Sequence, residues 1–225
     1  MIDKEIKLDF ERSERIGFGE AIFCADKSSA QISRILNKAH DSGLAMLITR
    51  LEPKKHDRLE SEHKNLIDYD PVSETGFFHA HLEPAQPASV AIVTAGTSDA
   101  RVAYEAARTL EFNGINSTVL FDVGVAGLWR LTEKIEEIKS YPIVIAVAGM
   151  DAALISVLGG LVPGLLIAVP TSTGYGAAHD GETALAASLV SCAPGVVVCN
   201  IDNGYGAACA AIRAIQAANL MYKEN

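Results

Sequence analysis

The chain has 225 residues, of which 49% are hydrophobic and 21% charged, and its formal net charge is −9. This length is enough for one full domain with a substantial apolar core and a second, smaller domain. An acidic chain without a long basic run lacks the positive face that phosphate backbones need, so no nucleic-acid partner is expected.

Two further features bear on where the protein works. The longest apolar stretch, residues 141–170, is interrupted by Asp151, by Gly159–Gly160 and by Pro163–Gly164. It therefore predicts buried strands and a helix instead of a membrane span. The N-terminus lacks the apolar centre of a signal peptide, and the four cysteines show no CxxC pair or disulfide-like spacing. We expect a cytoplasmic protein with no membrane partner.

The first part of the chain, residues 1–85, predicts a small α+β domain. Residues 28–43 have the spacing of an amphipathic helix that begins with a capping serine and ends at a glycine. Residues 44–50 predict a strand, and residues 75–81 predict a second one.

Two polar segments complete this part. The charge cluster at residues 50–65 is typical of a solvated loop or helix face. The segment EPAQPAS, residues 83–89, contains two prolines and predicts the linker to the second domain.

The second part, residues 86–225, alternates apolar runs with helical patterns. The predicted strands are residues 90–95, 117–122, 143–148, 165–170 and 196–201. The predicted helices are residues 99–112, 127–139, 150–160, 182–191 and 205–221. Strands that are buried on both sides and alternate with helices imply a doubly wound, mostly parallel α/β sheet. Five strands favour the flavodoxin-like strand order over a full dinucleotide-binding fold.

A turn rich in glycine or hydroxyl side chains follows every predicted strand. The turns are AGTSDA (95–100), DVGVAG (122–127), AGMD (148–151), PTSTGYGA (170–177) and NIDNGYGA (200–207). They meet at the carboxyl edge of a parallel sheet, where open α/β folds bind ligands. Capping and turn formation explain any single loop of this kind. Five of them on one edge favour a small ligand that carries phosphate.

Several motifs that would point to other chemistry are absent or unsupported. No Walker A motif occurs and no GxGxxG follows the first strand of the second part, which argues against a kinase or an ordinary dehydrogenase. His79 and His81 share one face of a predicted strand, but without ligands at suitable spacing a packing or surface role is favoured over metal binding. His179 lies in the fourth loop, where the sequence gives a proton-transfer role no further support.

Three of the four cysteines lie within residues 191–209. Cys199 ends the apolar run of a predicted buried strand, and Cys24 and Cys209 have apolar neighbours, so all three are interpreted as packed side chains. Cys192 differs, because it lies in the turn SCAPG between a helix and a strand. From these residues alone Cys192 is either a nucleophile or a small apolar side chain, and the second interpretation is favoured.

Six motifs follow one another along the second part: VTAGTSD (93–99), DVGVAGL (122–128), VAGM (147–150), VPTSTGYGA (169–177), SCAPG (191–195) and NIDNGYGA (200–207). Together they resemble the LarB family of nickel-pincer cofactor biosynthesis proteins, and ERIGFGEAIF (14–23) resembles that family's N-terminal segment. The second half is also similar to PurE, the carboxyaminoimidazole ribonucleotide mutase, whose Ser-Asp pair matches Ser98–Asp99. PurE's Ser-Ala-His-Arg after the second strand is replaced here by DVGVAG, which argues against the PurE reaction itself.

The resemblance implies a carboxylase and hydrolase. Its substrates would be nicotinic acid adenine dinucleotide and CO2 or bicarbonate, and its products pyridinium-3,5-biscarboxylic acid mononucleotide and AMP. Cys192 of SCAPG would add to the pyridinium ring and make a neighbouring carbon nucleophilic. The acidic residue after AGM would handle the ring proton. That residue is Asp151, where the family pattern has glutamate, and Trp129 stands where histidine is expected.

Two other functions stay open beside this one. The first is a PurE-like carboxylase or mutase that acts on an aminoimidazole ribonucleotide. The second is a non-catalytic, nucleotide-sensing homologue, which the aspartate at position 151 favours.

The resemblance also implies which side chains form the site. Ser98 and Asp99 join Cys192 and Asp151 as the catalytic candidates. The substrate-binding candidates come from the five loops: Gly96, Thr97, Asp122, Gly124, Thr171, Ser172, Gly174, Tyr175, Gly176, Asn200, Asp202, Asn203 and Gly204. Asp99, Asp122 and Asp202 are candidates to hold magnesium on the pyrophosphate, although loop capping explains each of them equally well.

The position of Cys192 raises a geometric question. Because this residue precedes its strand, it should lie at the amino edge of the sheet, opposite the ligand loops. Either residues 178–191 run back across the cleft, or a neighbouring subunit supplies the cysteine. PurE-like proteins are octamers whose sites draw on several subunits, so the resemblance favours a homo-oligomer with shared active sites.

Overall fold

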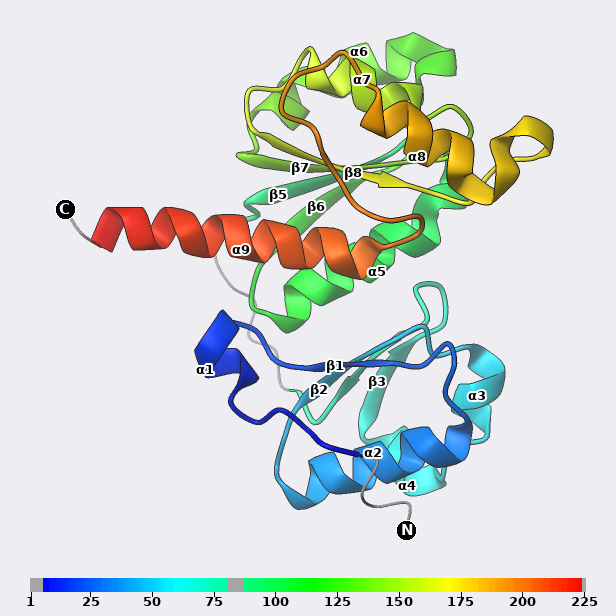
Figure 1. Ribbon diagram of the computed structural model, residues 1–225, viewed down its shortest axis with the longest axis vertical. Coiled ribbons are helices and arrows are strands. Elements are labelled where there is room, and N and C mark those ends of the chain that lie inside the picture. The colour runs from blue at the N-terminus through cyan, green and yellow to red at the C-terminus, as the bar shows by residue number, and fades with distance from the viewer. Residues whose placement is uncertain (1–5, 81–86, 224–225) are drawn as a thin grey trace. The chain divides into compact units, whose positions relative to one another are not determined.

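The fold is taken from a computed structural model, which describes residues 6–80 and 87–223 (Figure 1). The chain divides into two units, Met1–Glu83 and Pro84–Asn225. The predicted domain boundary between residues 85 and 86, residues 83–86 of the predicted linker, and His81 lie outside the described residues. These three predictions therefore stay predictions.

The N-terminal unit is built on a four-stranded mixed sheet. Its strands are β1 (Ala21–Phe23), β2 (Met46–Thr49), β3 (Ile67–Asp70) and β4 (Thr75–Phe78), in the order β1-β2-β4-β3. Its helices are α1 (Arg12–Ile16), α2 (Ser29–Asp41), α3 (Pro53–Asp57) and α4 (Ser61–Asn65). Strand β1 runs parallel to β2, whereas β4 is antiparallel to both of its neighbours. The predicted helix and both predicted strands are present, the charge cluster forms α3 and α4, and sequence analysis missed β1 and β3.

Helix α2 begins where its sequence predicts. The Ser28 hydroxyl accepts a hydrogen bond from the backbone N–H of Gln31 at 3.3 Å, and the Gln31 side chain accepts one from the backbone N–H of Ser28 at 2.9 Å. This capping box satisfies backbone donors that the helix itself leaves unpaired. The predicted apolar face is buried and packs with β1, β2 and β4: Ile32, Ile35, Leu36 and Ala39 against Ile22, Met46, Ile48 and Phe78.

The C-terminal unit contains a five-stranded sheet in which every pairing is parallel. The strands are β5 (Val90–Thr94), β6 (Ser117–Leu120), β7 (Ile143–Ala148), β8 (Leu165–Pro170) and β9 (Val197–Val198), in the order β6-β5-β7-β8-β9. Along the chain this is second, first, third, fourth and fifth, so the predicted flavodoxin-like α/β fold is confirmed. The order reverses between β5 and β7, and such a reversal opens a crevice at the carboxyl ends of those two strands.

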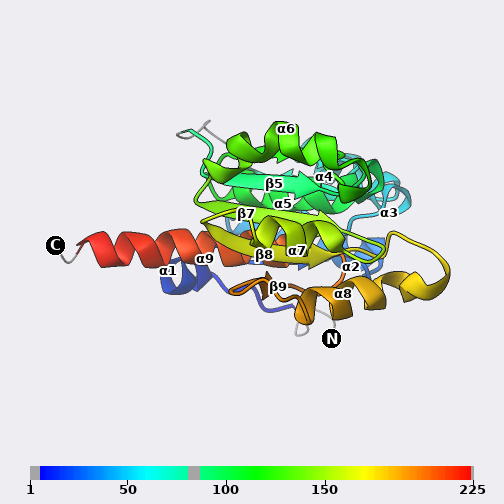
Figure 2. The same ribbon diagram turned by 90° about the horizontal axis from the view of Figure 1, so that it is seen from above.

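Helices cover both faces of this sheet, as Figure 1 shows. Helices α5 (Ala100–Phe112) and α9 (Gly204–Lys223) pack together on one face. Helices α6 (Leu128–Lys139), α7 (Ala153–Gly159) and α8 (Glu182–Leu189) cover the other, where they share one apolar core with the strands. In the view from above, α7 lies over β7 and β8, and α8 runs beside β9 at the edge of the sheet (Figure 2). Three short 3-10 helices are present in the loops: η2 (Thr97–Asp99), η3 (Val125–Gly127) and η4 (Gly176–Gly181).

Two elements differ from the prediction by the most at their boundaries. The predicted buried strand at residues 196–201 is only two residues long and lies at the edge of the sheet, with Val197 45% exposed. Cys199 therefore follows β9 instead of ending a buried strand, and it is only partly buried. Helix α7 starts at Ala153 instead of residue 150, because Met150 and Ala152 have left-handed φ values of 54° and 51° that no helix continues through.

No helix in the described part of the chain has both the length and the apolar character that a membrane span requires.

The close approach of α5 and α9 depends on Gly204. A Cβ atom at this position would lie 2.3 Å from the carbonyl oxygen of Val102 and 3.0 Å from the backbone nitrogen of Ala106. Both are backbone atoms of α5, so a Gly204→Ala side chain fits only if the two helices separate. We expect this variant to lower the free energy of unfolding by about 1–3 kcal/mol, measured by urea denaturation.

The matched control is Gly160→Ala at the end of α7, where the nearest such atom to a new Cβ is 3.6 Å away. This variant should leave the urea midpoint nearly unchanged. Equal effects of the two substitutions would contradict the close approach described here.

Candidate active site

A cavity of about 240 Å³ opens at the carboxyl ends of β5 and β7, where the strand order reverses. Its walls come from the loops after β5, β6 and β7, together with Thr173 from the loop after β8. Five of the predicted site residues line it: Gly96, Ser98, Asp99, Gly124 and Asp151. A Cβ at Gly124 would lie 2.4 Å from the carbonyl oxygen of Ala95, so glycine is needed for two of these loops to approach each other.

Asp99 is the buried carboxylate of this cavity, with only 2% of the residue exposed. It accepts hydrogen bonds from the backbone N–H of Gly96 at 2.9 Å and from the Thr171 hydroxyl at 2.7 Å. Burial raises the pKa of Asp99 above its usual range, although these hydrogen bonds and one from Thr173 oppose the rise. A carboxyl group that keeps its proton to higher pH than usual is suited to proton transfer.

Asp151 lies at the rim of the cavity in the turn between β7 and α7. One of its carboxylate oxygens accepts a hydrogen bond from the backbone N–H of Ala153 at 3.3 Å, at the start of the helix. The residues on either side of it, Met150 and Ala152, are both left-handed. The Met150 backbone N–H donates to the carbonyl of Thr173 at 2.9 Å, which fixes the turn against the loop after β8.

Unusual backbone conformations are concentrated along this edge of the sheet. Of the nine described non-glycine residues with positive φ, six lie in the loops after β6, β7, β8 and β9: Asp122, Met150, Ala152, His179, Asp180 and Asp202. Such conformations cost free energy and persist where the surrounding structure holds them, which is typical of functional sites.

The predicted carboxylate Asp122 forms an ion pair with Arg130 of α6. The backbone N–H of Asp122 donates to the Thr94 hydroxyl at 3.1 Å, which ties this loop to the end of β5. Arg130 lines the cavity as well.

Asp202 is held in a second network at the same edge. It accepts hydrogen bonds from the backbone N–H and the hydroxyl of Ser172 at 2.9 and 2.7 Å, and lies 3.1 Å from the guanidinium of Arg101. No group of three or more His, Cys, Asp or Glu among the described residues is placed to hold a metal ion. Asp99, Asp122 and Asp202 each have protein partners of their own, and magnesium binding by them stays a prediction.

The remaining predicted binding residues lie in the loops after β5, β8 and β9 and are not part of the cavity lining. Thr97 and Tyr175 are exposed, the second by 82%, and Gly174 and Gly176 have positive φ in the loop after β8. In the last loop, Asn200 accepts from the backbone N–H of Ile201, Asn203 accepts from that of Gly206, and Gly204 packs against α5. Loop formation and packing therefore account for the contacts of this last loop.

Sequence analysis missed Arg101 and Arg130. Both lie in the first turn of a helix, where the helix dipole disfavours a cation. In each case the arginine directly follows a glycine-rich loop of the kind that binds ligands. This combination in the sequence indicates a candidate binding residue.

Cys192 lies at the opposite edge of the sheet. After β8 the chain passes through η4 and then α8, which carries it about 12 Å toward the amino end of β9. The Ser191 hydroxyl lies 2.8 Å from that of Ser156, and a Cβ at Gly159 would lie 2.5 Å from the side chain of Ala193. The turn SCAPG is thus packed against the last residues of α7, whereas the first residues of α7 line the cavity. Residues 178–191 do not run back across the cleft, so that alternative is wrong.

Cys192 is also the exposed member of the four cysteines. Cys24 is fully buried, and burial raises the pKa of its thiol to about 12. Burial also raises the pKa of Cys199, and Cys209 is partly buried on α9. A thiol with a raised pKa is a poor nucleophile, which disfavours the buried cysteines. The exposed Cys192 is therefore the favoured nucleophile.

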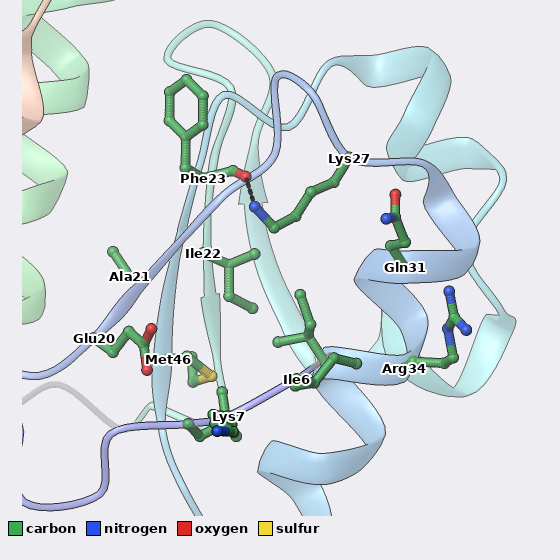
Figure 3. Close-up of a pocket in the computed structure, with 12 residues that line it drawn as sticks. Ile6, Lys7, Glu20, Ala21, Ile22, Phe23, Lys27, Gln31, Arg34 and Met46 are labelled. Carbon is green, nitrogen blue, oxygen red and sulfur yellow. Dashed lines mark hydrogen bonds between the residues drawn. The ribbon is translucent and has the colours of Figure 1, made fainter. Parts of the chain in front are cut away.

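The N-terminal unit has a cavity of its own, about 290 Å³ in volume, between β1 and α2 (Figure 3). Apolar side chains such as Ile22 and Met46 line it, together with Lys27 and Arg34. Lys27 donates to the carbonyl oxygen of Phe23 at 2.9 Å. None of the predicted site residues lies here, so the candidate chemistry belongs to the C-terminal unit.

Comparisons with known proteins cover both units. A model of the LarB/PurE-like N-terminal domain matches residues 3–80, and a model of the AIR carboxylase domain matches residues 89–225. The uncharacterized protein MJ0165 of Methanocaldococcus jannaschii is 36% identical over 213 residues, which cover 92% of this chain and 82% of that protein.

The raised pKa of Asp99 has a consequence for stability. Above pH 3.8 an ordinary aspartate loses its proton, while the buried Asp99 still holds it, so the folded state binds more protons than the unfolded state. The contribution of Asp99 to the free energy of unfolding should therefore fall as pH rises through the raised pKa. Asp99→Asn removes this titration. We expect its stability relative to the unmodified protein to increase with pH over that range and to level off above it.

Urea denaturation at a series of pH values measures this difference. Glu136→Gln, an exposed position on α6, is the control and should show no such trend. A difference between Asp99→Asn and the unmodified protein that is constant with pH, or that falls as pH rises, would show that the Asp99 pKa is not raised.

Proposed function

The chain belongs to the family of LarB/PurE-like proteins with an AIR carboxylase domain, and on this basis we propose that it carboxylates and hydrolyses nicotinic acid adenine dinucleotide. The second substrate is CO2 or bicarbonate, and the products are pyridinium-3,5-biscarboxylic acid mononucleotide and AMP, as nickel-pincer cofactor biosynthesis requires. The observation that carries the proposal is that Cys192 is exposed, within an apolar surface. The same chain has a cavity lined by Asp99 and Asp151 where the strand order of the sheet reverses.

The chemistry needs a nucleophile because a pyridinium ring is too poor in electrons to attack CO2. The Cys192 thiolate forms a C–S bond to a ring carbon, and the electron pair of the broken π bond moves to the ring nitrogen. The resulting enamine carbon then bonds to CO2. Loss of the proton on that carbon and departure of the thiolate restore the aromatic ring, so the cysteine is regenerated. Hydrolysis of the phosphoanhydride, by addition of water to phosphorus, releases AMP.

Asp151 is proposed to take up the ring proton. Asp151 lines the cavity, and the residues on both sides of it have left-handed backbone conformations that define the turn. A turn fixed in this conformation can hold the shorter aspartate in a defined position where the family pattern has glutamate. The buried Asp99, whose pKa is raised by burial, is the second carboxyl group of the cavity that we propose for proton transfer.

Because the cavity and Cys192 lie at opposite edges of the sheet, the proposed reaction needs two chains. The surface around Cys192 is apolar, with Leu189 65%, Val190 80% and Val197 45% exposed. Among the described strands β9 pairs only with β8, which leaves its outer edge open to another chain. The cavity, at about 240 Å³, is also smaller than the roughly 300–1,000 Å³ of typical small-molecule sites, which agrees with a site that a second chain completes.

We infer from these features a homo-oligomer in which Cys192 of one chain faces the cavity of another. The octamer of the PurE-like proteins that this chain resembles is the assembly we expect.

One other reaction has direct support. The match to the AIR carboxylase domain and the Ser98–Asp99 pair favour a PurE-like carboxylase or mutase that acts on an aminoimidazole ribonucleotide. The loop DVGVAG, which stands where PurE has Ser-Ala-His-Arg, disfavours it. The product masses of the two reactions differ, so one experiment separates them.

Intact-protein mass spectrometry tests the covalent step. We expect nicotinic acid adenine dinucleotide, added without CO2 or bicarbonate, to increase the mass of the protein by one dinucleotide, and peptide mapping to place the adduct on Cys192. Without the carbon source the adduct cannot proceed to carboxylation, so it should accumulate.

Cys192→Ala should form no adduct and no product, whereas Cys209→Ala should retain both. A dinucleotide adduct that persists in Cys192→Ala would contradict the proposed nucleophile. Formation of carboxyaminoimidazole ribonucleotide from an aminoimidazole ribonucleotide would favour the alternative reaction, and binding without turnover of either substrate would favour a sensor.

A further inference from the structure

Three charged side chains line the cavity at the carboxyl ends of β5 and β7, within the described part of the chain. Two are acidic, Asp99 and Asp151, and the third is Arg130. An anionic group that entered this cavity would be repelled by both carboxylates when they are ionised. Arg130 already pairs with Asp122, but it is the basic residue of this lining and therefore the side chain that attracts such an anion.

Contacts with two neighbouring segments fix the position of the Arg130 side chain. Its guanidinium pairs with Asp122, whose own left-handed backbone is tied to the hydroxyl of Thr94. A Cβ at Gly127 would lie 2.7 Å from Nε, 2.9 Å from Nη2 and 3.1 Å from Cζ of Arg130. The absence of a side chain at Gly127 thus provides the space that the guanidinium occupies. This arrangement holds a cation in the first turn of α6, against the preference of the helix dipole.

The charges of the cavity match those of one kind of ring. A pyridinium cation is stabilised by the carboxylates of Asp99 and Asp151, and a carboxylate on the same ring is complementary to Arg130. The guanidinium is planar and presents parallel N–H donors that fit the two oxygens of a carboxylate. A carboxamide at the same ring position carries no charge, and its NH2 group would turn a donor toward the donors of Arg130.

We propose that Arg130 binds the ring carboxylate of the substrate and so makes the site select nicotinic acid adenine dinucleotide over nicotinamide adenine dinucleotide. The identity of the ring rests on the proposed function, whereas the contact rests on the charge pattern and geometry of the cavity. The ring lies in the cavity with its carboxylate group on the guanidinium, and its nitrogen, which carries the ribose, faces the mouth of the cavity, where Asp151 lies. The pyrophosphate and the adenosine extend out of the cavity.

Equilibrium binding of the two dinucleotides tests this assignment. Calorimetry in a Cys192→Ala background measures affinity while no adduct can form. We expect the acid dinucleotide to bind at least about tenfold more tightly than the amide dinucleotide, because a charge-assisted bidentate contact is lost with the amide. Arg130→Gln should bring the ratio of the two dissociation constants close to one, mainly by weakening binding of the acid.

Two further variants separate the charge of Arg130 from its position. Arg130→Lys keeps the charge but loses the planar fork, and should retain an intermediate ratio. Gly127→Ala keeps the arginine but places a methyl group where its guanidinium now lies, and should lower the ratio without removing a charge. Lys134→Gln removes a cation one turn further along α6 that pairs with Glu137 outside the cavity, and should leave the ratio unchanged.

The outcomes that overturn the assignment are distinct. If Arg130→Gln weakens both dinucleotides equally, Arg130 contacts the pyrophosphate that they share. If it changes neither, or if neither dinucleotide binds the unmodified cavity, Arg130 is not a ligand-binding residue.

These results are independent of turnover. A ratio that depends on Arg130 in a protein without carboxylase activity would support this inference and contradict the proposed reaction. Carboxylation that proceeds with a ratio unaffected by Arg130→Gln would do the reverse.

Discussion

The proposed function depends on a geometric property of the parallel sheet. All strands of the C-terminal unit run in one direction, so their carboxyl ends share one edge and their amino ends the other. Loops that follow strands form the cavity, and residues that precede a strand lie at the far edge. Cys192 precedes β9 and α8 carries it away from the cavity, so a single chain separates the proposed nucleophile from the acidic groups. The exposed apolar side chains around Cys192 are what a second chain would cover.

At the loop edge, contacts between different loops hold charged groups in fixed positions. Thr171 from the loop after β8 donates to Asp99 from the loop after β5, and Ser172 donates to Asp202 from the loop after β9. The ion pair between Asp122 and Arg130 fixes one wall in the same way. Charges that are already oriented need little reorganisation when a substrate binds, which is how electrostatic preorganisation lowers a reaction barrier.

Most of the fold could be predicted because strands that are buried on both faces produce unmistakable apolar runs, as in IVIAVA at β7 and LLIAVP at β8. Strands β1 and β3 were missed because they are three and four residues long, and β3 reads IDYD, without an apolar pattern. The end of β9 was placed too late, because the apolar run VVVC reports a tendency to be buried and not the number of residues that pair.

The side-chain arrangement of the site was less predictable. The raised pKa of Asp99 depends on burial and on Thr171, which is 72 residues away in the sequence. The contact of Arg130 with the cavity depends on the path of η3 and on the missing side chain of Gly127. Both follow from the three-dimensional fold, although the arginine in the first turn of α6 was visible in the sequence.

The claim that each active site combines the cavity of one chain with Cys192 of another is tested most directly by subunit mixing. Cys192→Ala and Asp151→Ala, each inactive alone, are combined in equal amounts, dissociated and allowed to reassemble. With random reassembly, about half of the cavities keep Asp151, and about half of these face a chain that keeps Cys192. About one quarter of the sites are then intact, so about one quarter of the unmodified activity should return. Mixed oligomers that show no activity, or an unmodified monomer that is fully active, would contradict the shared site.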